Sequence, residues 1–143
     1  MALIVPTILT VNQDGYKAFV ASYYTFAKRV QIDIADGNFV AVQTIAVSEV
    51  RWPQDWEVDI HMMVSRPSDY IQTLIDLHPT LVIFHAEADE DLLPIMKLLK
   101  NNGIRAGVAL LKSTFPGKFE NIIKERYFFR LSEIFKDFRY FRR

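Results

Sequence analysis

The chain contains no cysteine among its 143 residues, and this absence removes two kinds of site. Neither a disulfide nor a thiolate metal site can form, and the composition fits a reducing cytoplasm. A net charge is also missing, because 17 Lys and Arg residues balance 17 Asp and Glu residues. The chain therefore has no overall field that would favour nucleic acid or a membrane surface. We expect a cytoplasmic protein whose partners include neither nucleic acid nor a membrane.

Long apolar runs are absent as well. No stretch approaches the roughly 20 apolar residues that a helix needs to span a bilayer. The first six residues, MALIVP, are apolar but carry no basic leader, so they indicate a first strand and not a signal peptide. Half of the residues are hydrophobic, which is enough for a core, and the length suits one domain.

Strand and helix patterns alternate along the chain. Strands are expected at about 3–9, 29–34, 57–63, 81–85 and 104–111. Helices are expected at about 14–28, 65–77 and 89–101, with a short one near 47–51 and a last one from about residue 118. Such alternation predicts right-handed crossovers and a parallel sheet.

Polar residues interrupt two of these strands. Gln31 and Asp33 share one face of the strand at 29–34, and Asp59 and His61 share one face of the next strand. Parallel strands that are covered on both faces are normally almost entirely apolar. Polar side chains placed there lose hydration, so they need either partners or a function.

Five segments, in this order, resemble the ribulose-phosphate 3-epimerase family. They are PTIL at 6–9, QIDIADGNFV at 31–40, DIHMMV at 59–64, FHAE at 84–87 and AGVAL at 106–110. The resemblance covers about residues 2–125. It implies an α/β fold, a parallel (β/α) barrel of TIM type that is incomplete here, with about five strand-helix units. It also implies an isomerase that moves protons at a carbon of a pentulose 5-phosphate with the help of a divalent metal.

The resemblance assigns the centre of the site to three residues. Asp33 matches an aspartate that acts as acid and base and also binds the metal, and His61 matches a metal ligand. Gln31 lies where the family normally has another histidine ligand. An amide is the weaker donor, so we expect weakened binding of zinc, manganese or iron. The residues alone leave simpler interpretations open, in which Asp33 and His61 are buried side chains satisfied by neighbours.

Four further residues match positions that contact the sugar phosphate in the family. Thr7 keeps a hydroxyl where the family has a serine, and Met63 and His85 face the same region by resemblance. Gly107 would leave room for a ligand. The alternatives are that Met63 only fills the core and that Gly107 only permits close packing.

The last eighteen residues differ from the rest. Residues 126–143 contain seven aromatic residues and six Lys or Arg residues against two acids. We therefore divide the chain into a partial barrel at 1–125 and a basic aromatic helix or tail at 126–143 with no counterpart in the family. Apolar residues recur there at helical spacing, which predicts a helix that covers exposed sheet. Open sheet edges also predict self-association of the chain.

Three functions follow from this sequence. The first is the epimerase reaction, with turnover by the isolated chain expected to be low because a second catalytic aspartate is not found. The second is an inactive partial barrel with weak ligand binding or a role in assembly. The third is another phosphate-binding barrel enzyme, a decarboxylase or hexulose-phosphate isomerase. Such an enzyme would normally have a lysine near Asp33 or Asp59, and the strands that contain these two residues have none.

Overall fold

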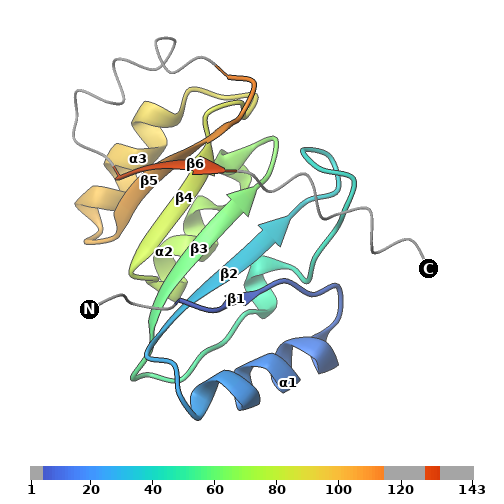
Figure 1. Ribbon diagram of the computed structural model, residues 1–143. Coiled ribbons are helices and arrows are strands. Elements are labelled where there is room, and N and C mark those ends of the chain that lie inside the picture. The colour runs from blue at the N-terminus through green and yellow to red at the C-terminus, as the bar shows by residue number, and fades with distance from the viewer. Residues whose placement is uncertain (1–4, 115–127, 133–143) are drawn as a thin grey trace.

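A computed structural model of the chain describes residues 5–114 and 128–132 (Figure 1). These residues form one sheet of six parallel strands, which lie side by side in the order in which they occur in the chain. The strands are β1 (Thr7–Ile8), β2 (Arg29–Ala35), β3 (Glu57–Met63), β4 (Leu81–His85), β5 (Arg105–Leu111) and β6 (Phe128–Ser132). The expected parallel sheet is confirmed, and it is a partial barrel of TIM type.

Helices connect the strands and pack on one face of the sheet. They are α1 (Gln13–Tyr24), the short 3₁₀ helices η1 (Val47–Glu49) and η2 (Pro67–Tyr70), α2 (Ile71–Leu77) and α3 (Leu92–Asn101). Tyr16, Leu74 and Met96 extend from α1, α2 and α3 into the largest apolar cluster, which contains the even-numbered residues of β2 to β4. The odd-numbered residues of these strands therefore face away from the helices. We refer to that side of the sheet as the inner face.

Side-chain caps fix where two helices begin. Asn12 accepts a hydrogen bond of 2.8 Å from the backbone N–H of Gly15 at the start of α1. Asp91 accepts one of 3.0 Å from Leu93 at the start of α3. Because an N-cap carboxylate satisfies a backbone donor that has no partner in the helix, α3 begins at residue 92 and not at the expected 89.

The helix expected in the tail is wrong over the part that the structure describes. Residues 128–132 form β6, which pairs with β5 from Gly107 opposite Phe128 to Leu111 opposite Ser132. The physical reason is that the edge of β5 presents backbone donors and acceptors that a strand can satisfy and a helix cannot. The rest of the tail, including the helix expected from residue 118, lies outside the described residues. The boundary at residue 125 stays a prediction.

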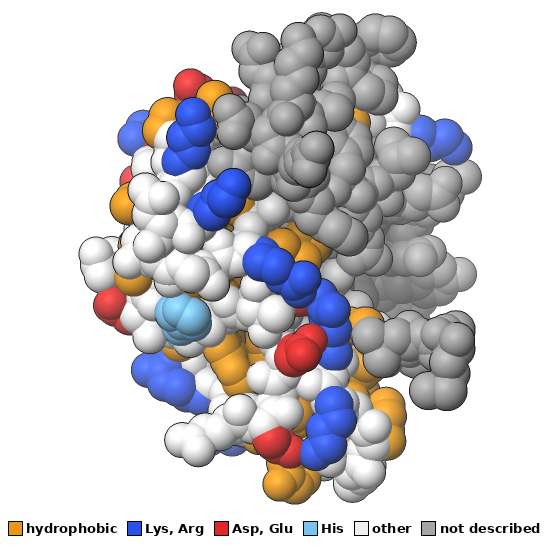
Figure 2. All heavy atoms as spheres, turned by 90° about the vertical axis from the view of Figure 1, so that its left-hand side faces the viewer, with side chains coloured by type: hydrophobic (Ala, Val, Ile, Leu, Met, Phe, Trp, Pro, Cys, Tyr) orange, Lys and Arg blue, Asp and Glu red, His pale blue; other side chains and the backbone are white. Residues whose placement is uncertain are grey.

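Surface charge is mixed on the side of the molecule that contains the N-terminal ends of the strands. Figure 2 shows basic and acidic side chains close to one another on this face. Lys28 pairs with Asp55, and Arg29 pairs with Glu57. Of the helices in the described ranges, α1 is the longest at 12 residues, and none has the length and apolar character to cross a membrane.

Candidate functional site

Polar side chains form a continuous chain of contacts on the inner face. The side-chain amide of Gln31 donates to Asp33 Oδ1 over 2.7 Å, and His61 Nδ1 lies 3.1 Å from the same oxygen. His61 Nε2 lies 2.9 Å from His85 Nε2, and His85 Nδ1 lies 3.5 Å from Glu87 Oε2. We refer to these five residues as the inner-face chain. The structure thus brings together four of the predicted site residues, Gln31, Asp33, His61 and His85.

Strand register explains why these residues meet. Asp33 lies directly opposite His61 in the pairing of β2 with β3. His61 lies opposite Ile83, so that His85 is one side-chain row nearer the C-terminal ends of the strands. In TIM-type barrels the catalytic residues lie at that end of the strands. The position of the inner-face chain is therefore the one at which this fold carries chemistry.

Burial sets the protonation state of His85 in the inner-face chain. His85 is 1% exposed and His61 is 3% exposed. Burial, with a smaller contribution from nearby His61, lowers the pKa of His85 to about 4, although Glu87 acts in the opposite direction. His85 is therefore neutral near pH 7. The aromatic ring of Phe39 packs beside it with the ring centroids 5.0 Å apart.

A carboxylate clamps the loop that carries Phe39. Asp36 Oδ1 accepts hydrogen bonds of 2.8 Å from the backbone N–H groups of Asn38 and Phe39. Asp36 Oδ2 accepts one of 2.8 Å from Ser65, in the segment after β3. Gly37 between them has a φ of 79°, a conformation that glycine adopts without strain. The clamp joins the loops after β2 and β3 at the same end of the sheet as His85.

The other predicted residues lie around this chain. Thr7 is exposed and lies opposite Gln31, and both line a cavity of about 380 Å³ near the N-terminal ends of the strands. Met63 is fully buried in an apolar cluster with Ala35. Gly107 is buried opposite Ile83 in the pairing of β4 with β5. Their contacts with a substrate stay predictions.

Two members of this region were not singled out from the sequence. Glu87 and Phe39 both lie within the segments that carry the family resemblance, but neither was given a role. The spacing of Glu87 was the available signal, because it lies two positions after His85 and alternate residues of an extended chain share a side. Phe39 gives no such signal, since its position depends on the clamp by Asp36.

Asp59 on the inner face of β3 has a structural partner. The guanidinium of Arg29 contacts both oxygens of Asp59, with Nε 3.0 Å from one and a terminal nitrogen 3.1 Å from the other. A two-point contact of this kind is the strong form of an Arg–carboxylate pair. This ion pair explains why an acid is tolerated at position 59. Its partner is an arginine and not the lysine expected of other phosphate-binding barrels.

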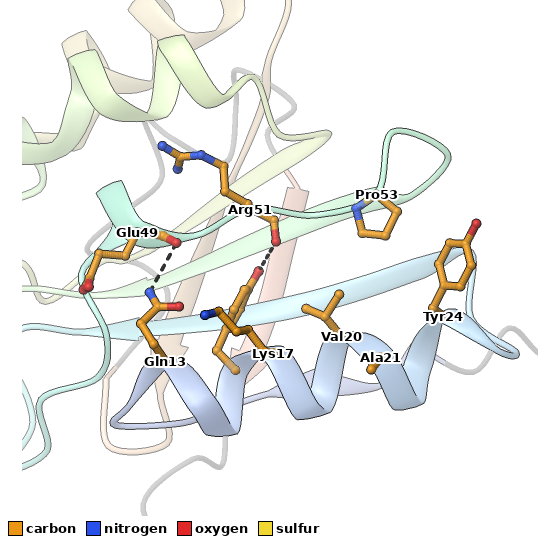
Figure 3. A pocket seen from close by; sticks show the side chains of 9 residues that line it. Gln13, Lys17, Val20, Ala21, Tyr24, Glu49, Arg51 and Pro53 are labelled. Atoms are coloured by element: carbon orange, nitrogen blue, oxygen red, sulfur yellow. Dashed lines mark hydrogen bonds between the residues drawn. The ribbon is translucent and has the colours of Figure 1, made fainter.

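A larger groove lies on the helix side of the sheet, away from the inner-face chain. It has a volume of about 680 Å³ and lies between α1 and residues 49–53 (Figure 3). Gln13 donates to the backbone carbonyl of Glu49, and the Tyr16 hydroxyl donates to that of Arg51. Burial raises the pKa of Tyr16 to about 12, which keeps this donor protonated. None of the predicted site residues lines the groove.

The inner face offers a divalent metal two strong kinds of donor, the carboxylate of Asp33 and the imidazole of His61. Their donor atoms, Asp33 Oδ1 and His61 Nδ1, lie 3.1 Å apart and are hydrogen-bonded to each other. Within the described ranges no group of three His, Cys, Asp or Glu side chains could hold a metal, so the third donor at hand is the Gln31 amide. Two buried atoms of the inner-face chain also lack a hydrogen-bond partner among the described residues, His85 Nδ1 and Glu87 Oε2. This donor set falls short of the three strong protein ligands that catalytic metals usually have.

A parallel β/α sheet with acid and imidazole groups toward the C-terminal ends of its strands is the arrangement of a TIM-type barrel. The model of the Ribulose-phosphate 3 epimerase family matches residues 3–132, and the chain belongs to that family. The match runs past residue 125 and includes β6.

Named relatives agree with this assignment. The chain is 36% identical to the ribulose-phosphate 3-epimerase of Bacillus subtilis over 99 residues, which is 67% of this chain and 46% of that protein. It is 30% identical to the Treponema pallidum enzyme of the same name over 91 residues, 62% of this chain and 42% of that protein. It is 33% identical to a cytoplasmic isoform from Oryza sativa over 89 residues, 59% of this chain and 39% of that protein. The chain thus spans less than half the length of these relatives.

Proposed function

We propose that the chain carries the acid/base half of a ribulose-phosphate 3-epimerase site, with Asp33 as the group that removes or returns the proton. The observation that supports this is the contact between Asp33 and His61, 3.1 Å apart, within the segment that matches the family. The substrate class is a pentulose 5-phosphate. Thr7, Met63, His85 and Gly107 are the proposed substrate contacts.

Asp33 would act on the carbon next to the substrate carbonyl. Its carboxylate takes the proton from carbon, and the electron pair of the broken C–H bond moves to the carbonyl oxygen, which gives an enediolate. The Gln31 amide and the His61 ring hold Oδ1 and so fix the orientation of the carboxylate. A divalent cation (zinc, manganese or iron), when held by Asp33, His61 and the Gln31 amide, supplies positive charge for the developing oxyanion.

Inversion also needs a proton donor on the opposite side of the carbon. The inner-face chain contains one other carboxylate, Glu87, which reaches Asp33 only through the two histidines. Low turnover is therefore the expected outcome for the chain alone. The alternative is an inactive partial barrel that binds ligand weakly or self-associates in the cytoplasm. It is favoured because the described residues offer no second acid in contact with Asp33, and because the described sheet has two edges, β1 and β6.

A coupled assay on ribulose 5-phosphate, with and without added manganese or zinc, tests the proposal. We expect turnover about 100-fold or more below that of a complete family member, because one positioned acid or base contributes about 10²–10⁴-fold. Asp33→Asn should abolish the remaining activity, while Asp76→Asn on the exposed side of α2 should not change it. Absence of turnover with ligand binding retained selects the inactive alternative. Activity that survives Asp33→Asn contradicts the proposal.

Gln31→His should strengthen zinc binding by about tenfold or more, because a third strong donor completes the usual catalytic set of ligands. Calorimetry with zinc measures the change. Gln13→His in the outer groove is the matched control, since it adds an imidazole away from the inner face. Equal affinity in the wild type and the Gln31→His variant would show that Asp33 and His61 do not form a metal site.

A further inference from the structure

One asparagine of the chain is followed by glycine, and the pair lies at an exposed turn. The sequence contains five asparagines, of which only Asn102 precedes a glycine, Gly103. Both residues are exposed where α3 ends. The backbone nitrogen of the next residue can attack an asparagine side chain, and glycine hinders that attack least because it has no Cβ. The fold itself favours glycine here, since φ of Gly103 is 77°.

Hydrogen bonds hold both reacting groups while the last turn of α3 is closed. The backbone N–H of Gly103 donates to the carbonyl of Lys100 over 3.0 Å, as in the common C-terminal cap with a left-handed glycine. The side-chain amide of Asn102 donates to the carbonyl of Leu98 over 2.9 Å. The side chain is thus turned back along the helix and away from the Gly103 nitrogen. Attack requires that the turn opens first.

A histidine from the neighbouring helix adds a third bond to this turn. His78 caps the end of α2, and its Nε2 lies 3.0 Å from the backbone oxygen of Asn102. Because a carbonyl oxygen only accepts, Nε2 carries a proton and donates. A Cβ atom at position 103 would lie 3.6 Å from the same Nε2, so the imidazole also packs close to Gly103. The bond joins the C-terminal ends of α2 and α3.

We propose that Asn102 is a site of spontaneous deamidation, and that His78 slows the reaction by holding the last turn of α3 closed. Helix ends are among the parts of a protein that open most easily. In the open turn the Gly103 nitrogen forms a bond to Cγ of Asn102 and loses its proton, while Nδ2 takes up a proton and leaves as ammonia. Water then opens the cyclic imide at either carbonyl, which gives aspartate or isoaspartate. This inference does not depend on the proposed function.

Either product alters the junction between α3 and β5. The new carboxylate lies at the C-terminal end of α3, where the helix dipole disfavours negative charge, and it no longer donates to Leu98. Isoaspartate also places one more carbon in the backbone shortly before β5 begins at Arg105. Ile104, between the turn and β5, is only 1% exposed. The modified chain should therefore unfold at a lower urea concentration than the original one.

Peptide mapping of the full chain by mass spectrometry, after several weeks in warm, mildly alkaline buffer, measures the reaction at each asparagine. We expect Asn102 to be converted first, to a mixture of aspartate and isoaspartate. Three other exposed asparagines are controls within the same sample, because the residue after each carries a side chain that hinders attack: Asn12, Asn38 and Asn101. Conversion of Asn102 no faster than that of these three would overturn the site.

His78→Asn tests the role of the histidine. Asparagine tolerates the left-handed conformation of position 78, where φ is 52°, and creates no new site because Pro79 follows it. We expect deamidation of Asn102 to be about two- to tenfold faster, which is the effect of one lost hydrogen bond on the opening of the turn. Gln72→Ala is the matched control, since it removes a hydrogen bond within α2 only.

Amide hydrogen exchange at Gly103 measures the opening of the turn directly, and it can be followed in the wild type. Over a series of low urea concentrations, exchange at Gly103 and deamidation of Asn102 should rise together. If deamidation does not follow exchange, opening of the turn does not control it. If His78→Asn changes neither rate, the role of His78 is wrong and the site stands.

Discussion

Removal of residues 126–143 is expected to abolish the stable monomeric fold, because β6 is removed with them. The five residues of β6 pair with the last five residues of β5, from Gly107 to Leu111. Without it, a buried strand becomes the edge of the sheet, and unpaired edges promote association between chains. Light scattering coupled to size-exclusion chromatography should show aggregates, and the urea midpoint should fall or the transition should disappear.

A shorter deletion provides the control. Removal of residues 133–143 leaves β6 in place, so this variant should keep more of the stability than the longer deletion. If the two deletions behave alike and both remain monomeric with the urea midpoint of the full chain, the pairing of β6 does not stabilise the sheet.

Phe84→Ala is expected to cost about 3–5 kcal/mol of unfolding free energy, the usual range for a large aromatic side chain removed from a core. Phe84 in β4 is fully buried on the helix side of the sheet, opposite Met62 on one side and Val108 on the other. Typical domains are stable by only about 5–15 kcal/mol. The variant should therefore unfold at a much lower urea concentration, as followed by circular dichroism.

Phe19→Ala on α1 is the matched substitution at a more exposed site, since Phe19 is 37% exposed. Its cost should be clearly smaller, because much of its surface is already in contact with water. Equal losses for the two variants would contradict the assignment of the core to the interface between helices and sheet.

The central strands were predictable because they are buried and short. The expected bounds 57–63 and 81–85 agree with β3 and β4 to the residue. Both strands are rich in β-branched and other large apolar side chains, which favour strands. The C-terminal end of α1 and the N-terminal start of α3 were less predictable. They depend on caps and turns, such as the side chain of Asp91, which compete with the continuing helical pattern.

β6 could not be predicted from its own residues. The tail has apolar residues at helical spacing, but Phe128 to Ser132 also suits an extended strand rich in aromatic residues. Short apolar segments of this kind do not distinguish the two by periodicity. The strand forms because the edge of β5 supplies a partner for it. That partner exists only in the folded protein, so the residues of β6 alone do not reveal it.

Part of the candidate site followed from alternation alone. Gln31 and Asp33 had to share a face, and the register of β2 and β3 then brought His61 to Asp33. The contact from His61 to His85 could not be predicted, because it requires the register of β4 against β3. The hydrogen bond from Leu111 to Glu87 likewise requires the position of β5. Residues that interact along a strand are visible in a sequence, whereas residues that interact across strands need the pairing.

The sequential strand order has a consequence for how the chain is made. Asp33 and His61 are separated by 28 positions, and His61 and His85 by 24. A ribosome adds about 5–20 residues per second, so each new strand emerges a few seconds after the neighbour with which it pairs. Loops of this length cost little entropy to close. The sheet is therefore suited to grow during translation, one strand at a time from β1, and the inner-face chain is complete soon after Glu87 leaves the exit tunnel.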